Sequence, residues 1–218
     1  MIRKIVGLYF SPIGGTASMI HKLTGDIATE LQECSPDELR FECYDLLNKN
    51  EPLPQLDDET IAIIGMPAYV GKIPLPGMRA IRQLHGNGAM AFATVSFGSR
   101  TYGNALYELR HFIEEQGFKV VGAGAFSVRY GSGLVKRRSS GIRVDSTSLA
   151  EFGKAASAKA KRLAGCDVEG LRIRPAPLEV SGKMPVHRVS RLSPKAAEIA
   201  QGVLQKICII RQDSEWYL

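Results

Sequence analysis

The sequence predicts a doubly wound α/β domain, built on a five-stranded parallel sheet and followed by a C-terminal extension. Apolar strand patterns alternate with amphipathic helix patterns over the first 166 residues, which is the order of successive βαβ units. The first strand pattern, Ile5 to Phe10, is continuously apolar, as expected for a parallel strand that is covered on both faces. A chain of 218 residues is long enough to bury the core of such a domain.

Each strand and helix can be placed in chain order. Strands are expected at residues 5–10, 41–46, 61–65, 89–95 and 118–126. Helices are expected at residues 16–33, 75–84, 104–116 and 146–163, where apolar residues recur at intervals of three and four. Ligands of doubly wound sheets bind beyond the carboxyl ends of the strands, at the point where the strand order reverses. The loops after the first, third and fourth strands should therefore carry the function.

The chain changes character after residue 166, so we divide it into a domain at 1–166 and an extension at 167–218. Prolines punctuate the start of the extension, and Ser193-Pro194 has the pattern of an N-cap and first helical position. The following helix needs a surface to pack on, and we expect it to pack on its own domain. Because the three candidate loops precede the extension, we expect the extension to be dispensable for ligand binding.

The N-terminal sequence and the hydropathy pattern favour a cytoplasmic protein. No apolar run approaches the roughly 20 residues that span a bilayer, so no membrane partner is expected. The start, Met1-Ile2-Arg3-Lys4, lacks the pattern of a secretory signal. The four cysteines, at 34, 43, 166 and 208, show no CxxC spacing. We expect them to be reduced thiols, and we expect no metal or iron–sulfur site.

A formal net charge of +6 is compatible with an acidic protein partner, a phosphorylated ligand or a nucleic acid. The basic residues gather in one stretch, with no acidic residue between Glu115 and Asp145. A single basic cluster without a nucleic-acid-binding motif is weak evidence for DNA or RNA, so no nucleic-acid partner is predicted. The cluster comprises Arg129, Lys136, Arg137, Arg138 and Arg143.

The loop between the first strand and the first helix has the composition of a phosphate cradle. Two adjacent glycines let backbone N–H groups approach an anion, hydroxyl groups flank them, and the helix dipole favours negative charge there. The loop has neither the GxxxxGK[ST] nor the GxGxxG spacing of nucleotide-binding loops. The competing interpretation is a capped strand-to-helix turn without a ligand. The candidate phosphate contacts are Ser11, Ile13, Gly14, Gly15 and Thr16.

This loop resembles the phosphate loop of the flavodoxin family, whose pattern is [ST]-x-[ST]-G-x-T. Ser11, Gly14 and Thr16 match it, whereas Ile13 stands where the family has a hydroxyl group. The resemblance implies a flavodoxin-like sheet with strand order 2-1-3-4-5, and FMN as the cofactor. It also implies one fewer side-chain hydrogen bond to the phosphate.

The loop after the third strand, Gly65 to Pro74, resembles the flavin-contacting loop of flavodoxin-like proteins, roughly G-x-P-x-y-x-G-x-x-P. A planar flavin ring needs an apolar or aromatic wall and backbone groups for its polar edge. We predict that Tyr69 supplies the wall; an exposed loop tyrosine is the alternative. The candidate cofactor contacts here are Pro67, Ala68, Tyr69, Gly71 and Lys72.

The loop after the fourth strand, Ser96 to Ala105, carries the glycines and the aromatic residue of the corresponding flavodoxin loop. Tyr102 is expected to frame the second side of the ring. The candidate cofactor contacts here are Phe97, Gly98, Arg100, Tyr102, Gly103 and Asn104. The local pattern most resembles the flavodoxin-like half of proteins in which a flavodoxin domain is fused to a bacterial-type ferredoxin.

Such fusion proteins continue into cysteine clusters, whereas this chain offers only Cys208 beyond residue 166. Electrons would therefore have to leave for another molecule. The first hypothesis is an FMN-binding electron-transfer protein, a monomer or homodimer, whose basic residues dock a redox partner such as an acidic ferredoxin. The second is an FMN-dependent NAD(P)H:quinone-type oxidoreductase. The third is a binding module with a degenerate flavin site.

Overall fold

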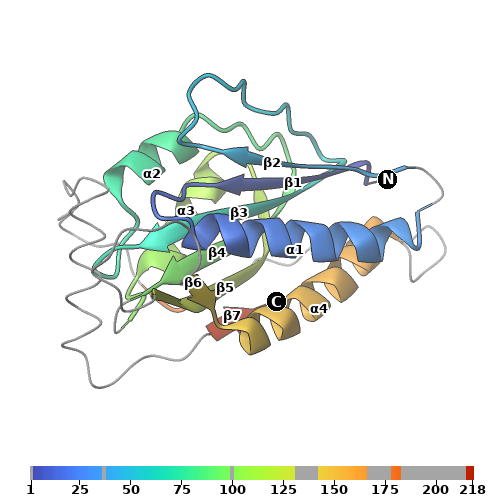
Figure 1. Cartoon of the computed structure of the whole chain (residues 1–218). Coiled ribbons are helices and arrows are strands. Elements are labelled where there is room, and N and C mark those ends of the chain that lie inside the picture. Colours follow the sequence, from blue (N-terminus) through green and yellow to red (C-terminus); the bar gives the residue numbers. More distant parts are fainter. Residues whose placement is uncertain (1, 36–37, 99–100, 131–141, 166–177, 183–214) are drawn as a thin grey trace.

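A computed structural model of the chain describes residues 2–35, 38–98, 101–130, 142–165, 178–182 and 215–218. Its centre is a twisted sheet with helices on both faces (Figure 1). The helix expected from Ser193 and most of the basic cluster lie outside the described residues.

Five parallel strands form the body of the sheet, in the order β2-β1-β3-β4-β5. The expected fold class and strand order are therefore confirmed. The strands are β1 (Lys4–Tyr9), β2 (Arg40–Asp45), β3 (Thr60–Ala68), β4 (Met90–Phe97) and β5 (Lys119–Tyr130). Each residue of β3 and β4 is buried, because both strands lie inside the sheet and helices cover both of their faces.

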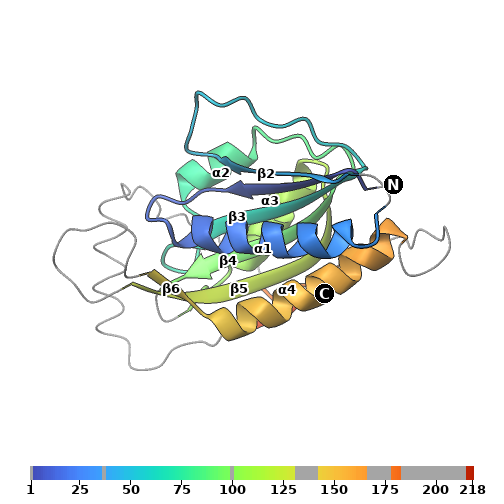
Figure 2. The ribbon, with the colours of Figure 1, turned by 45° about the vertical axis from the view of Figure 1, so that its right-hand side comes forward.

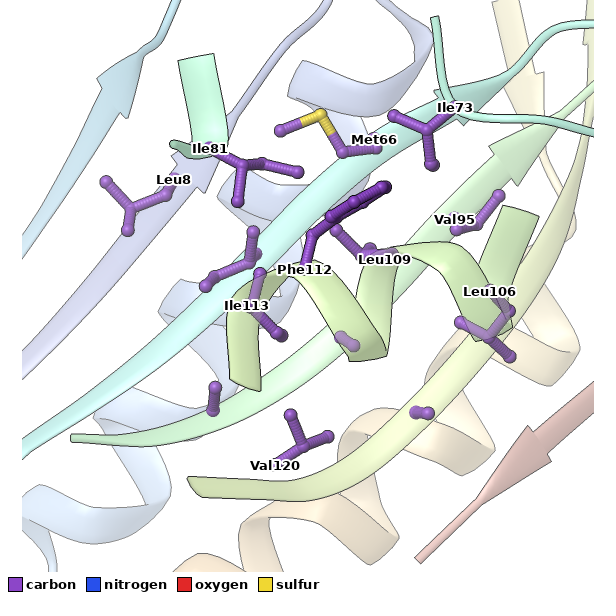
Figure 3. Close-up of a cluster of buried hydrophobic side chains, with 14 of the residues drawn as sticks. Leu8, Met66, Ile73, Ile81, Val95, Leu106, Leu109, Phe112, Ile113 and Val120 are labelled. Atoms are coloured by element: carbon purple, nitrogen blue, oxygen red, sulfur yellow. The ribbon is translucent and has the colours of Figure 1, made fainter. Parts of the chain in front are cut away.

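Each face of the sheet carries two of the described helices (Figure 1, Figure 2). The helices are α1 (Gly15–Gln32), α2 (Leu75–Ile81), α3 (Ala105–Glu115) and α4 (Ser146–Ala164). One hydrophobic cluster lies under α1 and α4, and the other lies under α2 and α3. Figure 3 shows the second cluster, in which Leu109 and Phe112 of α3 lie over the strands beside Met66. No helix within the described ranges is long and apolar enough to cross a membrane.

Two short antiparallel strands, β6 (Ile142–Val144) and β7 (Glu215–Tyr217), pair with β5 and were not expected from the sequence. The prediction ended the fifth strand at Phe126 and treated 127–143 as a loop, whereas β5 continues to Tyr130 and pairs there with β6. A three-residue strand is too short to show a periodic pattern. Its position depends on a partner that is distant in sequence.

The structure also corrects one expectation about the cysteines. Cys34 is disulfide-bonded, and its partner lies outside the described residues. Cys43 has a free thiol, and burial raises its pKa. Sequence spacing could not reveal the disulfide, because two cysteines far apart in the chain can be neighbours in the fold.

Helix α1 lies directly on β1 and β3 because both strands carry a glycine beneath it. A Cβ atom on Gly65 would lie 2.6 Å from Cδ1 of Ile20, and one on Gly7 would lie 2.6 Å from Oγ1 of Thr24. Neither distance is compatible with a side chain unless the facing side chains of α1, or the helix itself, move. Since α1 begins at the carboxyl end of β1, these glycines fix the height of its first turn above the sheet.

Replacing Gly65 by alanine should destabilise the protein by about 1–3 kcal/mol, because the added methyl group overpacks the α1 interface. Gly25→Ala is the matched control, since a Cβ atom at this interior position of α1 would meet nothing within 4 Å. It should stabilise the protein by about 0.5–1 kcal/mol through helix propensity and chain entropy. Urea unfolding measures both changes, and equal effects of the two variants would contradict this packing argument.

Candidate functional site

The loops after β1, β3 and β4 lie together at the carboxyl edge of the sheet (Figure 1, Figure 2). The strand order reverses between β1 and β3, because the chain moves outward from β1 to β2 and then returns to the other side of β1. This edge is therefore the switch point at which doubly wound sheets bind ligands. It brings together the three segments that the sequence singled out.

The first loop turns into α1 through Gly14, whose φ of 86° lies in the left-handed region. The Ser11 Oγ accepts a hydrogen bond of 2.9 Å from the Ala17 N–H. Within the described part of the chain, no acceptor binds the N–H groups of Gly15 and Thr16. The first turn of α1 also contains no acidic residue. Two free donors at the positive end of a helix dipole suit a phosphate or carboxylate.

The Thr16 hydroxyl lies beneath this turn rather than at the surface. Thr16 is 2% exposed, and its Oγ1 lies 2.8 Å from the Oγ of Ser96 in β4. This buried hydrogen bond ties the first turn of α1 to the end of β4. Sequence reasoning missed Ser96, although a polar residue within the apolar strand Met90–Phe97 is a visible signal that it needs a buried partner.

The second loop begins with a tight two-residue turn. Two backbone hydrogen bonds pair Tyr69 with Lys72, at 2.9 Å and 3.2 Å, and the residues between them, Val70 and Gly71, have φ of 53° and 73°. A left-handed conformation is strained for a β-branched residue such as valine. The Val70 side chain is 57% exposed at the tip of the turn, whereas Tyr69 is only 7% exposed.

The second and third loops make close backbone contact through two glycines. A Cβ atom on Gly103 would lie 2.7 Å from the Cα of Gly71, so neither position has room for a larger residue. The Asn104 N–H donates a hydrogen bond of 2.9 Å to the Gly71 carbonyl. Of the predicted contacts, Gly71, Gly103 and Asn104 are thus brought together directly.

A buried carboxylate supports the second loop from below. Glu108 of α3 is fully buried, and its Oε2 accepts a hydrogen bond of 2.8 Å from the Ile73 N–H. Sequence reasoning missed this residue as well. Its signal is an acidic residue on the apolar face of α3, between Ala105 and Phe112. A carboxylate is rarely buried without such partners.

Several of the remaining predicted contacts are buried and one lies outside the described residues, whereas Ile13 and Lys72 are half-buried. Tyr102 is 5% exposed; its ring centroid lies 5.5 Å from that of Phe97, and its hydroxyl donates a hydrogen bond to Glu215 near the C-terminus. Pro67 and Ala68 are buried residues of β3, and Gly98 is buried as well. Arg100 lies outside the described residues. Among the residues described, no group of His, Cys, Asp and Glu could hold a metal ion.

Comparison with solved structures identifies the fold. A flavodoxin from the domain Archaea superposes with a TM-score of 0.51 and 16% sequence identity, over 72% of this chain and 99% of that one. An NADH:FMN oxidoreductase superposes with a TM-score of 0.49 and 16% sequence identity, over 72% of this chain and 87% of that one. An oxidoreductase from Corynebacterium diphtheriae superposes with a TM-score of 0.48 and 14% sequence identity, over 78% of this chain and 99% of that one. No family model matches the chain, and no curated protein matches it significantly. The chain has a flavodoxin-like fold.

The hydrogen bond between Tyr102 and Glu215 should make stability sensitive to alkaline pH. Burial first, and then the Glu215 carboxylate, raise the pKa of Tyr102 above its ordinary value of 10.0. The folded state therefore holds this proton more tightly than the unfolded state. The resulting stability is complete below about pH 10 and is lost as the pH rises further.

We expect the free energy of unfolding to fall more steeply above about pH 10 in the wild type than in Tyr102→Phe. At pH 7 the variant should be less stable by about 1 kcal/mol, because Glu215 loses one donor. Urea unfolding at several pH values between 7 and 11 measures both effects. If the free energy of unfolding depended on pH in the same way in both proteins, the folded state would not hold the Tyr102 proton more tightly than the unfolded state.

Proposed function

We propose that this chain is an FMN-binding electron-transfer protein of the flavodoxin type. The single observation that carries the proposal is the pair of N–H groups on Gly15 and Thr16, which no described residue binds, at the start of α1 and at the switch point of a flavodoxin-like sheet. A phosphate monoester is a ligand group that such a helix terminus binds. FMN carries one such group, and FAD would need a second site for its adenosine half.

The residues around the first loop fit a phosphate in their donor chemistry. The Gly15 and Thr16 amides offer two donors, and the Ser11 hydroxyl still has its own hydrogen to donate while it accepts from Ala17. Thr16 contributes through its backbone, because its hydroxyl is paired with Ser96. Ile13 leaves one position of the flavodoxin pattern without a hydroxyl group.

For the ring, we propose that Val70 is the apolar contact in place of Tyr69. Val70 projects from a turn whose two bridging hydrogen bonds hold it at the carboxyl edge, and its side chain is exposed. The bound FMN would supply the electron-transfer chemistry. The chain's own residues would bind the phosphate, orient the ring and exclude water from one of its faces.

The electron acceptor is proposed to be a separate, acidic protein such as a ferredoxin. The charge of the chain supports this, as does its resemblance to the flavodoxin half of flavodoxin–ferredoxin fusions. Arg143 in β6 is exposed, whereas Lys136, Arg137 and Arg138 lie outside the described residues. We place this function in the cytoplasm.

The first test compares FMN with riboflavin, which lacks the phosphate. Titration followed by flavin fluorescence should show quenching by both ligands, with FMN bound at least about tenfold more tightly because of the helix-terminal donors. Ile13→Thr should tighten FMN binding about three- to tenfold through one added hydrogen bond, equal to about 0.5–1.5 kcal/mol. Valine has nearly the same shape as threonine but lacks the hydroxyl group, so Ile13→Val should leave the affinity for FMN unchanged.

Equal affinities for FMN and riboflavin would move the phosphate away from α1. A protein that quenches neither flavin would reject the proposed function itself. Sustained oxidation of NADH or NADPH by the FMN-loaded protein, without any partner, would assign it to the reductases instead of the electron carriers.

Val70→Gly should separate stability from binding. Glycine relieves the left-handed strain, so we expect the free energy of unfolding to rise by about 1 kcal/mol. Loss of the apolar contact should weaken FMN binding about fivefold, equal to about 1 kcal/mol.

The matched control for this variant is Asn87→Gly. Asn87 also has a positive φ, of 47°, but it precedes β4 at the opposite edge of the sheet. Its replacement should leave FMN affinity unchanged. Unaltered FMN binding by Val70→Gly would remove Val70 from the site.

A further inference from the structure

Residues Glu215–Tyr217, close to the end of the chain, are part of the sheet. Strand β7 lies antiparallel on the outer edge of β5, where Ala125 pairs with Glu215, Gly124 with Trp216 and Ala123 with Tyr217. Figure 1 shows β7 beside β5 and close to the start of α4. The C-terminus therefore returns to the domain that carries the candidate site.

Two glycines of β5 leave room for the side chains of Trp216 and Leu218. A Cβ atom on Gly122 would lie 2.6 Å from Cδ2 of Leu218, and one on Gly124 would lie 3.3 Å from Cβ of Trp216. The Trp216 ring packs edge-on against Phe152 of α4, at a centroid distance of 6.3 Å. Tyr217 packs on the opposite face of the sheet, against the cluster beneath α2 and α3. Packing on both faces of β7 distinguishes it from a loosely attached tail.

The side chain of Glu215 connects β7 to the third loop. Its two carboxylate oxygens accept hydrogen bonds from the hydroxyl groups of Tyr102 and Tyr217. Tyr102 directly precedes Gly103 and Asn104, the two residues that contact Gly71. A continuous series of contacts thus runs from the C-terminus to the turn that presents Val70.

A second segment of the extension supports the same loop. A Cβ atom on Gly182 would lie 2.7 Å from Cβ of Tyr107 and 3.3 Å from Oδ1 of Asn104. Leu178 and Val180, just before it, are buried in the hydrophobic cluster beneath α2 and α3. Two parts of the extension, far apart in sequence, therefore meet around the start of α3.

We propose that Glu215 is a positioning residue of the candidate site, which acts by holding Tyr102 and, through it, the contact between the second and third loops. This inference rests on the proposed function and deepens it: Glu215 orders the flavin-binding edge without contacting the flavin. It reverses the sequence-based expectation that the extension is dispensable for ligand binding.

The test uses three full-length variants: Glu215→Ala, Glu215→Gln and Trp216→Ala. Glu215→Ala should weaken FMN binding about tenfold, which is the loss expected for charge-assisted hydrogen bonds. Glu215→Gln keeps one carbonyl acceptor and should recover part of that loss. Trp216→Ala is the matched control, because Trp216 lies in the same strand but packs against α4; it should bind FMN like the wild type.

A double-mutant cycle tests the route through Tyr102. If Glu215 acts by holding Tyr102, then Tyr102→Phe and Glu215→Ala should not be additive, and the double variant should bind FMN about as weakly as Glu215→Ala alone. The visible circular dichroism of bound FMN should change in the same variants, since it reports the surroundings of the ring. Full additivity would show that the two residues act independently.

Hydrogen exchange of the Asn104 amide, which is bonded to Gly71, gives a readout that needs no flavin. It should quicken in Glu215→Ala and remain unchanged in Trp216→Ala. Wild-type affinity for FMN together with wild-type exchange in Glu215→Ala would overturn this proposal and leave the proposed function standing. Faster exchange in a protein that binds no FMN at all would reject the proposed function and retain the positioning role of Glu215.

Discussion

The backbone contact between Gly71 and Gly103 is the constraint on which the candidate site depends. Two loops from neighbouring strands can meet this closely only because neither residue has a side chain. The hydrogen bond from Asn104 to Gly71 then fixes their relative position. A left-handed valine costs free energy and persists only where its surroundings hold it from several sides. Val70 lies next to this contact. The contact therefore explains how the strained turn persists.

Beneath this edge lie two buried polar contacts. Thr16 pairs with Ser96, and Glu108 accepts from Ile73. Buried polar atoms cost free energy unless they are hydrogen-bonded, so these pairs allow few alternative arrangements of the loops above them. The hydrophobic clusters lower in the sheet supply stability, whereas these directional contacts fix where each loop begins.

The fold was predictable from the sequence because its signals are local and repeated. Continuous apolar strands such as Ile5 to Phe10 alternate with amphipathic helices, and this alternation leaves few topologies open. The site was only partly predictable. The glycines at 14, 71 and 103 mark turns in any reading of the sequence, but the direction of a side chain depends on partners far along the chain. The Tyr102 hydroxyl is bonded to Glu215, 113 residues away, and no local pattern contains that information.

Strand β5 explains why the end of the chain and the candidate site are coupled. Without β6 and β7, the outer edge of β5 would expose a row of unpaired backbone N–H and C=O groups. Another chain could pair with such an edge. Two short antiparallel strands cover this edge in succession, at 128–130 and 123–125. Because the third loop leaves the neighbouring strand β4, a side chain of the covering strand can reach it, and Glu215 does so. One of the two strands that cover the sheet edge therefore also supports the candidate site, through the side chain of Glu215.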